Sequence, residues 1–235
     1  INTKNLKDLK LSWSLSMNEG SNQVTPLVSQ GIMFLTNPGN IIQALDARNG
    51  ELIWEYSYPF PKGSKTLGGP TRNIAIYEDK IFMATYDASL IALDIKTGKL
   101  QWKTKKANFK DGYTHTSGPI VANGVIVSGI NGCERYIEEG SFITGHDPEN
   151  GEELWRTSTI ANPGDEYGDT WGNTDKVFRA GGDTWIPGSY DPELNLFFIG
   201  TSQAKPWVAD SRGMSTEDSA LYTNSTLAIN PNTGK

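Results

Sequence analysis

The stretch ALDIKTGKLQW, residues 92–102, decides the fold of this 235-residue chain, because close copies of it occur elsewhere. ALDARNGELIW occupies residues 44–54, and GHDPENGEELW occupies residues 145–155. The glycines of the three copies are 48 and 53 residues apart, and a fourth copy, LAINPNTGK, contains Gly234. This spacing is typical of β-propeller blades, each of which is one sheet of a radial array.

Each copy has the pattern of two strands joined by a tight turn. Residues 91–94 alternate like the end of a strand, and Asp94 is placed to accept hydrogen bonds from backbone amides two residues on. Gly98 supplies the positive φ that closes the turn, and Trp102 lies on the next strand. With KIFMAT (80–85) as a further strand upstream, we predict blades between which the tryptophans pack.

The alternative is a β-sandwich with accidental internal similarity, but three matches to one phrase favour the propeller. Trp13, in LKLSW, resembles the end of a preceding repeat, and the interval of 83 residues between Gly151 and Gly234 predicts an insertion. We therefore expect residues 1–235 to form a single partial β-propeller domain of roughly four to five blades, truncated at its C-terminal end.

Composition supports a turn-rich β protein and excludes several classes. The chain has 25 glycines and 7 tryptophans. Its net charge of −6 argues against a nucleic-acid partner, which would favour a basic face. The single cysteine, Cys133, excludes an internal disulfide and a multi-cysteine zinc site. No apolar run reaches the ~18 residues of a membrane span, and no dinucleotide or P-loop motif is present.

The repeated phrase resembles the tryptophan-docking motif of the quinoprotein alcohol dehydrogenases, which use pyrroloquinoline quinone (PQQ) and a calcium or lanthanide ion. Further stretches match that family in order: VTPLV (24–28), residues 72–94, residues 115–134, residues 188–201 and KPW (205–207). The resemblance implies an all-β fold, the N-terminal part of an eight-bladed propeller. It also implies oxidation of a primary alcohol to an aldehyde by hydride transfer to metal-bound PQQ.

The resemblance places two metal ligands. Glu134, in NGCE, falls where the family has a carboxylate on the metal, and hard cations favour oxygen ligands. The alternative is a solvated loop glutamate beside Glu138 and Glu139. Gln203 falls where an asparagine is expected, and its carbonyl oxygen could reach the ion through one extra methylene.

The resemblance also places a loop against the cofactor. Asn131, Gly132 and Cys133 match the loop whose backbone lies against the quinone, and Gly132 would permit a close approach. Cys133 is then a small wall residue of the site. A reactive pair of Cys133 with His115 is the alternative.

Three further positions match groups that hold the quinone. Trp185 matches the tryptophan on which the ring stacks, Arg72 the arginine that pairs with a cofactor carboxylate, and Thr116 a hydroxyl donor. The alternatives are a packing tryptophan and ordinary surface or turn residues.

Other positions depart from the family pattern. Gln23 replaces a glutamate that contacts the quinone, so it brings an amide without charge. Asp183 replaces a threonine and either adds a negative ligand or faces solvent. Residues 65–73, KTLGGPTRN, replace an adjacent cysteine pair, and a Gly-Gly turn is expected to fill the space above the cofactor.

No catalytic residue is assigned within this chain, because the family's base lies downstream of the fourth phrase. The resemblance implies an alcohol substrate, cytochrome c or a similar electron acceptor, a periplasmic location and, as an open alternative, a homodimer. Competing hypotheses are a non-catalytic propeller scaffold of the outer-membrane assembly type and a PQQ-dependent sugar or polyol dehydrogenase.

Overall fold

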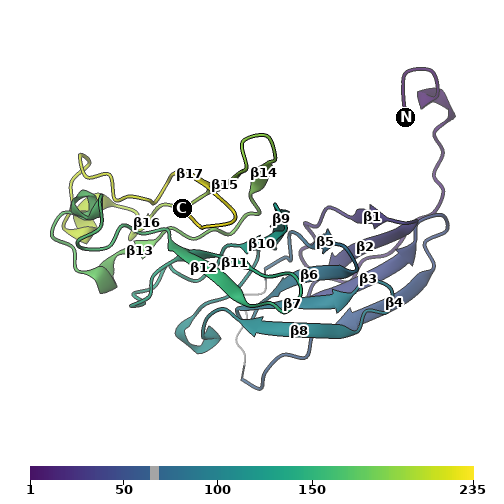
Figure 1. Ribbon diagram of the computed structural model, residues 1–235, viewed down its shortest axis with the longest axis horizontal. Helices are drawn as coiled ribbons and strands as arrows, with labels where there is room; N and C mark the ends of the chain where they lie inside the picture. The colour runs from purple at the N-terminus through teal and green to yellow at the C-terminus, as the bar shows by residue number, and fades with distance from the viewer. Residues whose placement is uncertain (64–68) are drawn as a thin grey trace.

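The computed structural model describes residues 1–63 and 69–235, and it is a row of β-sheets that follow one another in chain order (Figure 1). Three sheets have four antiparallel strands, and in each the strands pair in sequence order. The first sheet contains β1 (Leu27–Ser29), β2 (Ile32–Asn37), β3 (Ile41–Asp46) and β4 (Leu52–Ser57). The second contains β5 (Ala75–Tyr77), β6 (Lys80–Thr85), β7 (Ser89–Asp94) and β8 (Leu100–Lys105). The third contains β9 (Ile120–Ala122), β10 (Val125–Ser128), β11 (Phe142–His146) and β12 (Glu153–Ser158).

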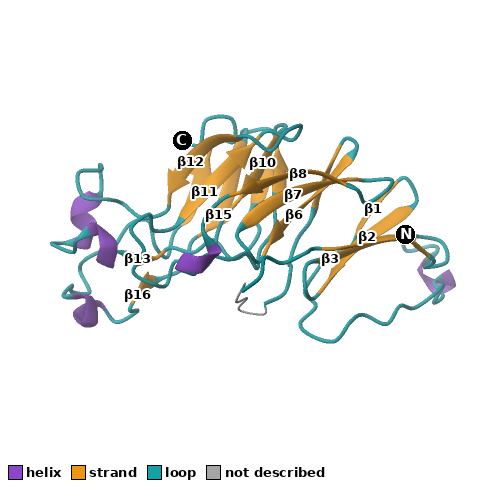
Figure 2. Ribbon diagram, turned by 90° about the horizontal axis from the view of Figure 1, so that it is seen from below, coloured by secondary structure: helices purple, strands orange, loops and turns teal. Residues whose placement is uncertain are grey.

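The fourth unit carries the insertion that the sequence predicts. Its sheet has three strands, β14 (Ser189–Asp191), β15 (Leu196–Gly200) and β17 (Thr226–Ile229), and a separate ribbon pairs β13 (Ala180–Gly181) with β16 (Ala204–Lys205). The 3₁₀-helices are Leu6–Asp8, Phe109–Asp111, Gly168–Trp171, Lys176–Phe178 and Ala209–Arg212. Figure 2 shows the short helices of the insertion beyond one end of the row of sheets. No helix in the described residues is long and apolar enough to cross a membrane.

The hydrophobic core lies between consecutive sheets. In β6, Ile81 and Met83 pack with the first sheet, whereas Phe82 and Ala84 pack with Ile126 of the third. Alternate residues of a strand point to opposite faces of its sheet. Because both faces of the second sheet are covered by a neighbouring sheet, every residue of β6 is buried. Contacts also join β5 to β9 and β9 to β14, so the first strands of neighbouring units meet. Each sheet thus packs against the next one along the chain, with the first strands of neighbouring sheets side by side. This is the arrangement of a partial β-propeller, and it confirms the predicted fold.

The repeated phrase builds the joint between two sheets. Trp54 on β4 lies against Gly98 of the next unit, where an added Cβ would approach the indole to 2.6 Å. Its Nε1 donates to the carbonyl oxygen of Ile95 at 3.1 Å. Trp102 docks in the same way on Gly151, and Trp155 docks on Gly234. Four tryptophans, Trp13, Trp54, Trp102 and Trp155, donate to a turn carbonyl of a neighbouring repeat.

Small residues and a β-bulge allow these indoles to fit. The strand pairs shift register beside each tryptophan, so that Ala44 lies opposite Trp54 and Ala92 opposite Trp102. The third copy has Gly145 opposite Trp155, and there an added Cβ would fall 2.2 Å from the ring. The first residue of the phrase is therefore small because the tryptophan of the same sheet covers it.

Candidate functional site

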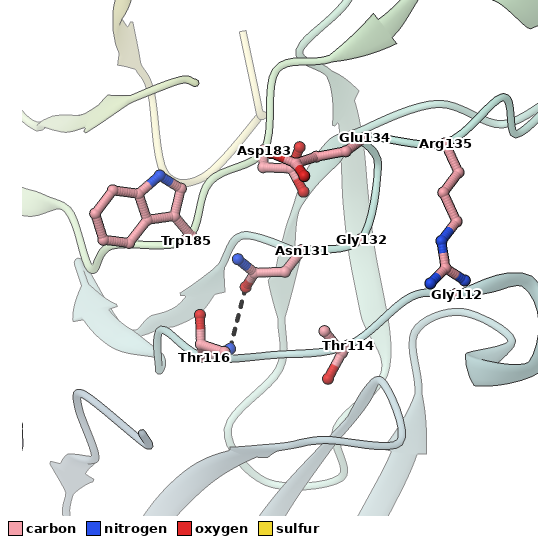
Figure 3. A pocket seen from close by; sticks show the side chains of 9 residues that line it. All are labelled: Gly112, Thr114, Thr116, Asn131, Gly132, Glu134, Arg135, Asp183 and Trp185. Atoms are coloured by element: carbon pink, nitrogen blue, oxygen red, sulfur yellow. Dashed lines mark hydrogen bonds between the residues drawn. The ribbon is translucent and has the colours of Figure 1, made fainter. Parts of the chain in front are cut away.

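A cavity of about 390 Å³ lies among the segment before β9, the loop between β10 and β11, and the segment between β13 and β14. Figure 3 shows its walls, which come from three segments far apart in the sequence. Its lining residues are Gly112, Thr114, Thr116, Asn131, Gly132, Glu134, Arg135, Asp183 and Trp185. Six positions predicted from the sequence are among them: Thr116, Asn131, Gly132, Glu134, Asp183 and Trp185.

Backbone pairing fixes two of the three segments against each other. Thr114 and Asn131 form an isolated antiparallel bridge with two hydrogen bonds of 3.0 Å. The Asn131 side chain then accepts a hydrogen bond from the Thr116 amide at 3.1 Å (Figure 3). Gly132 has φ of +94°, and an added Cβ would lie 2.1 Å from the Gly112 carbonyl oxygen. Glycine is required there because the two backbones meet.

Asp183 belongs to the interior of the site. Only 4% of the residue is exposed, and its Oδ1 accepts the Cys133 backbone N–H at 3.0 Å. Burial raises the pKa of the Asp183 carboxyl, the hydrogen bond from Cys133 opposes this, and the charge of Glu134 raises it further. Of the two orientations that the sequence left open, the side chain therefore does not face solvent. It adds a second carboxylate beside Glu134 (Figure 3).

Cys133 packs in the core behind the cavity. It is 1% exposed, with Tyr113, Ile130 and Phe142 in the same buried cluster. Burial raises the pKa of its thiol well above the usual value, so the thiol is a poor nucleophile. Both ring nitrogens of His115 are buried without a hydrogen-bond partner among the described residues. The structure therefore contains no hydrogen bond from His115 to Cys133.

Trp185 and Arg72 lie together at one side of the cavity. Trp185 is 43% exposed, so its indole is accessible, and the Arg72 guanidinium lies 4.9 Å from the ring centroid. Arg72 Nη1 also donates to the Thr116 carbonyl oxygen at 3.0 Å. Arg72 therefore contacts two lining residues although it is not itself part of the wall.

Glu134 forms an ion pair that the sequence did not predict. Lys205 Nζ lies 2.9 Å from Glu134 Oε1. The Glu134 side chain is 58% exposed, so it combines exposure to solvent with a place on the cavity wall. In the described part of the chain no group of three or more histidine, cysteine or acidic side chains is placed to hold a metal ion.

Two predicted residues lie apart from the cavity. Gln23 is exposed in the segment before β1, where its side chain donates to Ser21 Oγ at 3.4 Å. Gln203 is exposed before β16 and does not line the cavity. Their assignment to the cofactor and the metal stays a prediction.

The first part of the expected Gly-Gly turn, residues 65–68, lies outside the described residues. Gly69, at its end, packs against Thr116, where an added Cβ would lie 2.5 Å from Cγ2. Gly69 therefore lies beside one lining residue of the cavity.

Three lining residues were missed by the sequence analysis: Gly112, Thr114 and Arg135. Thr114 alternates with Thr116 along an extended segment, so period-two spacing was a usable signal for it. Arg135 directly follows Glu134, and nothing in its local sequence distinguishes it from a surface arginine. Gly112 is identified only by its approach to Gly132 across the bridge.

Comparison with known proteins identifies similar chains over the full length. A family profile described as "Glucose/ethanol/alcohol dehydrogenase, beta-propeller domain" matches residues 1–235. The quinoprotein alcohol dehydrogenase PedH of Pseudomonas putida is 32% identical over all of this chain and 42% of its own length. The quinohemoprotein alcohol dehydrogenase ADH-IIG of Pseudomonas putida is 34% identical, again over all of this chain and 34% of its own length.

Solved structures of similar dehydrogenases superpose on this chain. A structure titled europium-containing methanol dehydrogenase superposes with a TM-score of 0.86 and 29% identity, covering 100% of this chain and 44% of that one. The quinohemoprotein alcohol dehydrogenase from Comamonas testosteroni gives a TM-score of 0.82 and 31% identity, covering 100% and 37%. The chain thus spans less than half the length of the proteins it matches.

Proposed function

Because this chain belongs to the quinoprotein alcohol dehydrogenase family, through its β-propeller domain, we propose that the intact protein oxidises a primary alcohol to an aldehyde with PQQ as cofactor. One observation carries the proposal. Six residues chosen by resemblance for a quinone and metal site, from three distant segments, line a single cavity. A scaffold without a ligand would not require these side chains to converge.

The lining residues suit a flat, anionic ring system. The accessible indole of Trp185 is a platform for a planar group, and the Arg72 guanidinium beside it can pair with a carboxylate. Asn131 and Thr116 add an amide and a hydroxyl to the same cavity. When bound, PQQ would supply the two-electron chemistry. The protein would supply orientation, charge and partial exclusion of water.

The carboxylates suit a hard cation. Glu134 and Asp183 both line the cavity and offer oxygen ligands, the type that calcium and lanthanide ions favour. They form only part of a coordination shell, which for calcium needs about 6–8 oxygens. We propose that these two side chains hold the ion and that Gln203 adds its side-chain oxygen.

Several parts of the proposal concern the intact protein. The base that accepts the alcohol proton is assigned to residues beyond those in this chain. The proposed electron acceptor is cytochrome c or a similar carrier, the proposed location is the periplasm, and a homodimer is one open arrangement. These proposals follow from the resemblance to the family rather than from any contact within this chain.

Binding of PQQ to the intact protein tests the cofactor assignment. PQQ should quench the tryptophan fluorescence, and Trp185→Ala should weaken binding about tenfold or more, because ring stacking is worth roughly 1–3 kcal/mol. Trp207→Ala is the matched control, since Trp207 is 74% exposed and outside the cavity. Equal effects of both substitutions, or no PQQ binding, would contradict the assignment.

Turnover tests the substrate class. With PQQ and a metal ion present, the intact protein should reduce an artificial electron-accepting dye when a primary alcohol is added. Turnover with sugars or polyols alone would replace the alcohol assignment by the sugar or polyol alternative. No turnover with either class would leave the chain without the proposed activity.

A further inference from the structure

The carboxylate proposed to hold the metal ion already has a cationic partner. Lys205 Nζ lies 2.9 Å from Glu134 Oε1, and the Lys205 side chain is only 22% exposed. A covered ammonium group has few alternative partners, and among the described residues Glu134 is the acidic side chain with which it pairs. This pair therefore differs from a mobile surface ion pair, in which both groups are highly exposed.

The backbone places this lysine beside the glutamate. Lys205 is the last residue of β16, where it pairs with Ala180 of β13. The next residue of β13, Gly181, donates its N–H to the Cys133 carbonyl oxygen at 2.8 Å. The ribbon is thus hydrogen-bonded to the residue that precedes Glu134. Main-chain pairing therefore holds the backbone at Lys205 close to the backbone at Glu134.

The second carboxylate is held independently of the lysine. Asp183 Oδ1 accepts the Cys133 N–H at 3.0 Å, and Oδ2 lies 3.5 Å from Ser202 Oγ. Two carboxylates thus line the cavity, and one of them is neutralised by a cation that belongs to the chain. A metal ion that uses both carboxylates competes with an ammonium group at Glu134.

We propose that Lys205 is a resident cation that competes with the metal ion for Glu134 and thereby lowers the metal affinity of this site. The ion binds only as the ammonium group leaves Glu134, so the lysine and the ion occupy the carboxylate alternately. The inference rests on the proposed function, because it assumes that Glu134 is a metal ligand. It identifies Lys205 as the residue that sets the metal concentration at which the site is half occupied.

Direct metal binding tests this proposal without any turnover. Tb³⁺ luminescence sensitised by tryptophan is a suitable probe, because Trp185 shares the cavity with Glu134 and Asp183. Lys205→Met keeps an unbranched side chain that is one atom shorter and removes its charge. We expect it to bind Tb³⁺ about tenfold more tightly than the unchanged protein, because one competing positive charge is absent. Calorimetric titration with Ca²⁺ should show a gain in the same direction.

Two variants locate the effect. Lys176→Met is the matched control, because Lys176 pairs with Glu138 at 3.9 Å on a neighbouring loop and does not line the cavity. It should leave the affinity for Tb³⁺ unchanged. Adding Glu134→Gln to Lys205→Met should abolish the gain. Circular dichroism of each variant separates loss of folding from loss of binding.

The results separate this proposal from the proposed function. Equal Tb³⁺ affinity of the unchanged protein and Lys205→Met, or no binding by either, would overturn the role of Lys205. So would a gain that persists when Glu134 is replaced. PQQ quenching, measured on the same samples without metal, tests the quinone assignment alone. Failure of PQQ to bind therefore counts against the proposed function, whereas the metal titrations decide the role of Lys205.

Discussion

At the scale of the residue, the third copy of the repeat carries a buried histidine. His146 stands where the other copies have Leu45 and Leu93, and it is fully buried. Its Nδ1 lies 3.1 Å from the Gly151 carbonyl oxygen, and its Nε2 lies 2.9 Å from Thr144 Oγ1. Because a carbonyl oxygen only accepts, Nδ1 carries a proton.

This histidine makes folding sensitive to acid. Burial, reinforced by the positive charge of Lys106, lowers the pKa of His146 to about 4, whereas an unfolded histidine titrates near 6.5. As the pH falls from 6.5 to 4 the unfolded chain takes up a proton that the native chain excludes, so stability is lost across that window. Between pH 7.5 and 5 we expect His146 to account for a loss of about 2 kcal/mol.

The measurement is urea unfolding at both pH values. His146→Leu, which restores the residue of the other copies, should reduce the loss on acidification by that amount. Comparing the change with pH, rather than stability at one pH, removes the packing effect of the substitution. Identical pH dependence in the two proteins would show that His146 is not the group responsible.

At the scale of the element, the turn of each phrase is defined by an aspartate and a glycine. Asp94 Oδ1 accepts the amides of Lys96 and Thr97, and the Gly98 N–H donates to the Asp94 carbonyl oxygen at 2.9 Å. Gly98 has φ of +68°, and the indole of Trp54 covers it. The turn therefore has two separate requirements for glycine, one in the backbone and one in packing.

Replacing this glycine separates the two requirements. Gly98→Ala should reduce the free energy of unfolding by about 2–4 kcal/mol, from the left-handed backbone and from overlap with Trp54. Gly39→Ala is the control, because Gly39 has φ of +92° with nothing within 4 Å of an added Cβ. It should cost only about 1–2 kcal/mol. Equal losses in urea unfolding would mean that the indole contact contributes nothing.

At the scale of the whole molecule, stability depends on joints between neighbouring sheets. Besides the tryptophans, a buried network links the first two sheets: Tyr58 Oη donates to Asp87 Oδ2 at 2.7 Å, and Lys103 Nζ lies 3.0 Å from the same oxygen. The insertion has a separate core around Trp171, which is fully buried. In such a serial array each joint mainly affects the units on either side.

The loss of stability on removing a docking tryptophan should therefore depend on which sheets that tryptophan connects. Trp102→Ala removes the indole between the second and third sheets and should cost about 3–5 kcal/mol. Trp13→Ala removes the same contact from a segment that contains no strand, so its cost should be clearly smaller. Hydrogen exchange should show local opening near Gly50 for Trp13→Ala and broad opening for Trp102→Ala. Similar global losses for both would contradict a serial arrangement.

The repeated phrase by itself determined the fold, because strand alternation, an aspartate-glycine turn and a docking tryptophan are local patterns whose spacing survives in the sequence. The resemblance also identified six lining residues, since they stand in recognisable short contexts. The partners of those residues were decided only by the tertiary structure. Lys205 lies 71 positions from Glu134 in the sequence and meets it through ribbon pairing, and Asp183 turns inward because the Cys133 amide binds it. Such contacts depend on distances between distant segments, which no local spacing encodes.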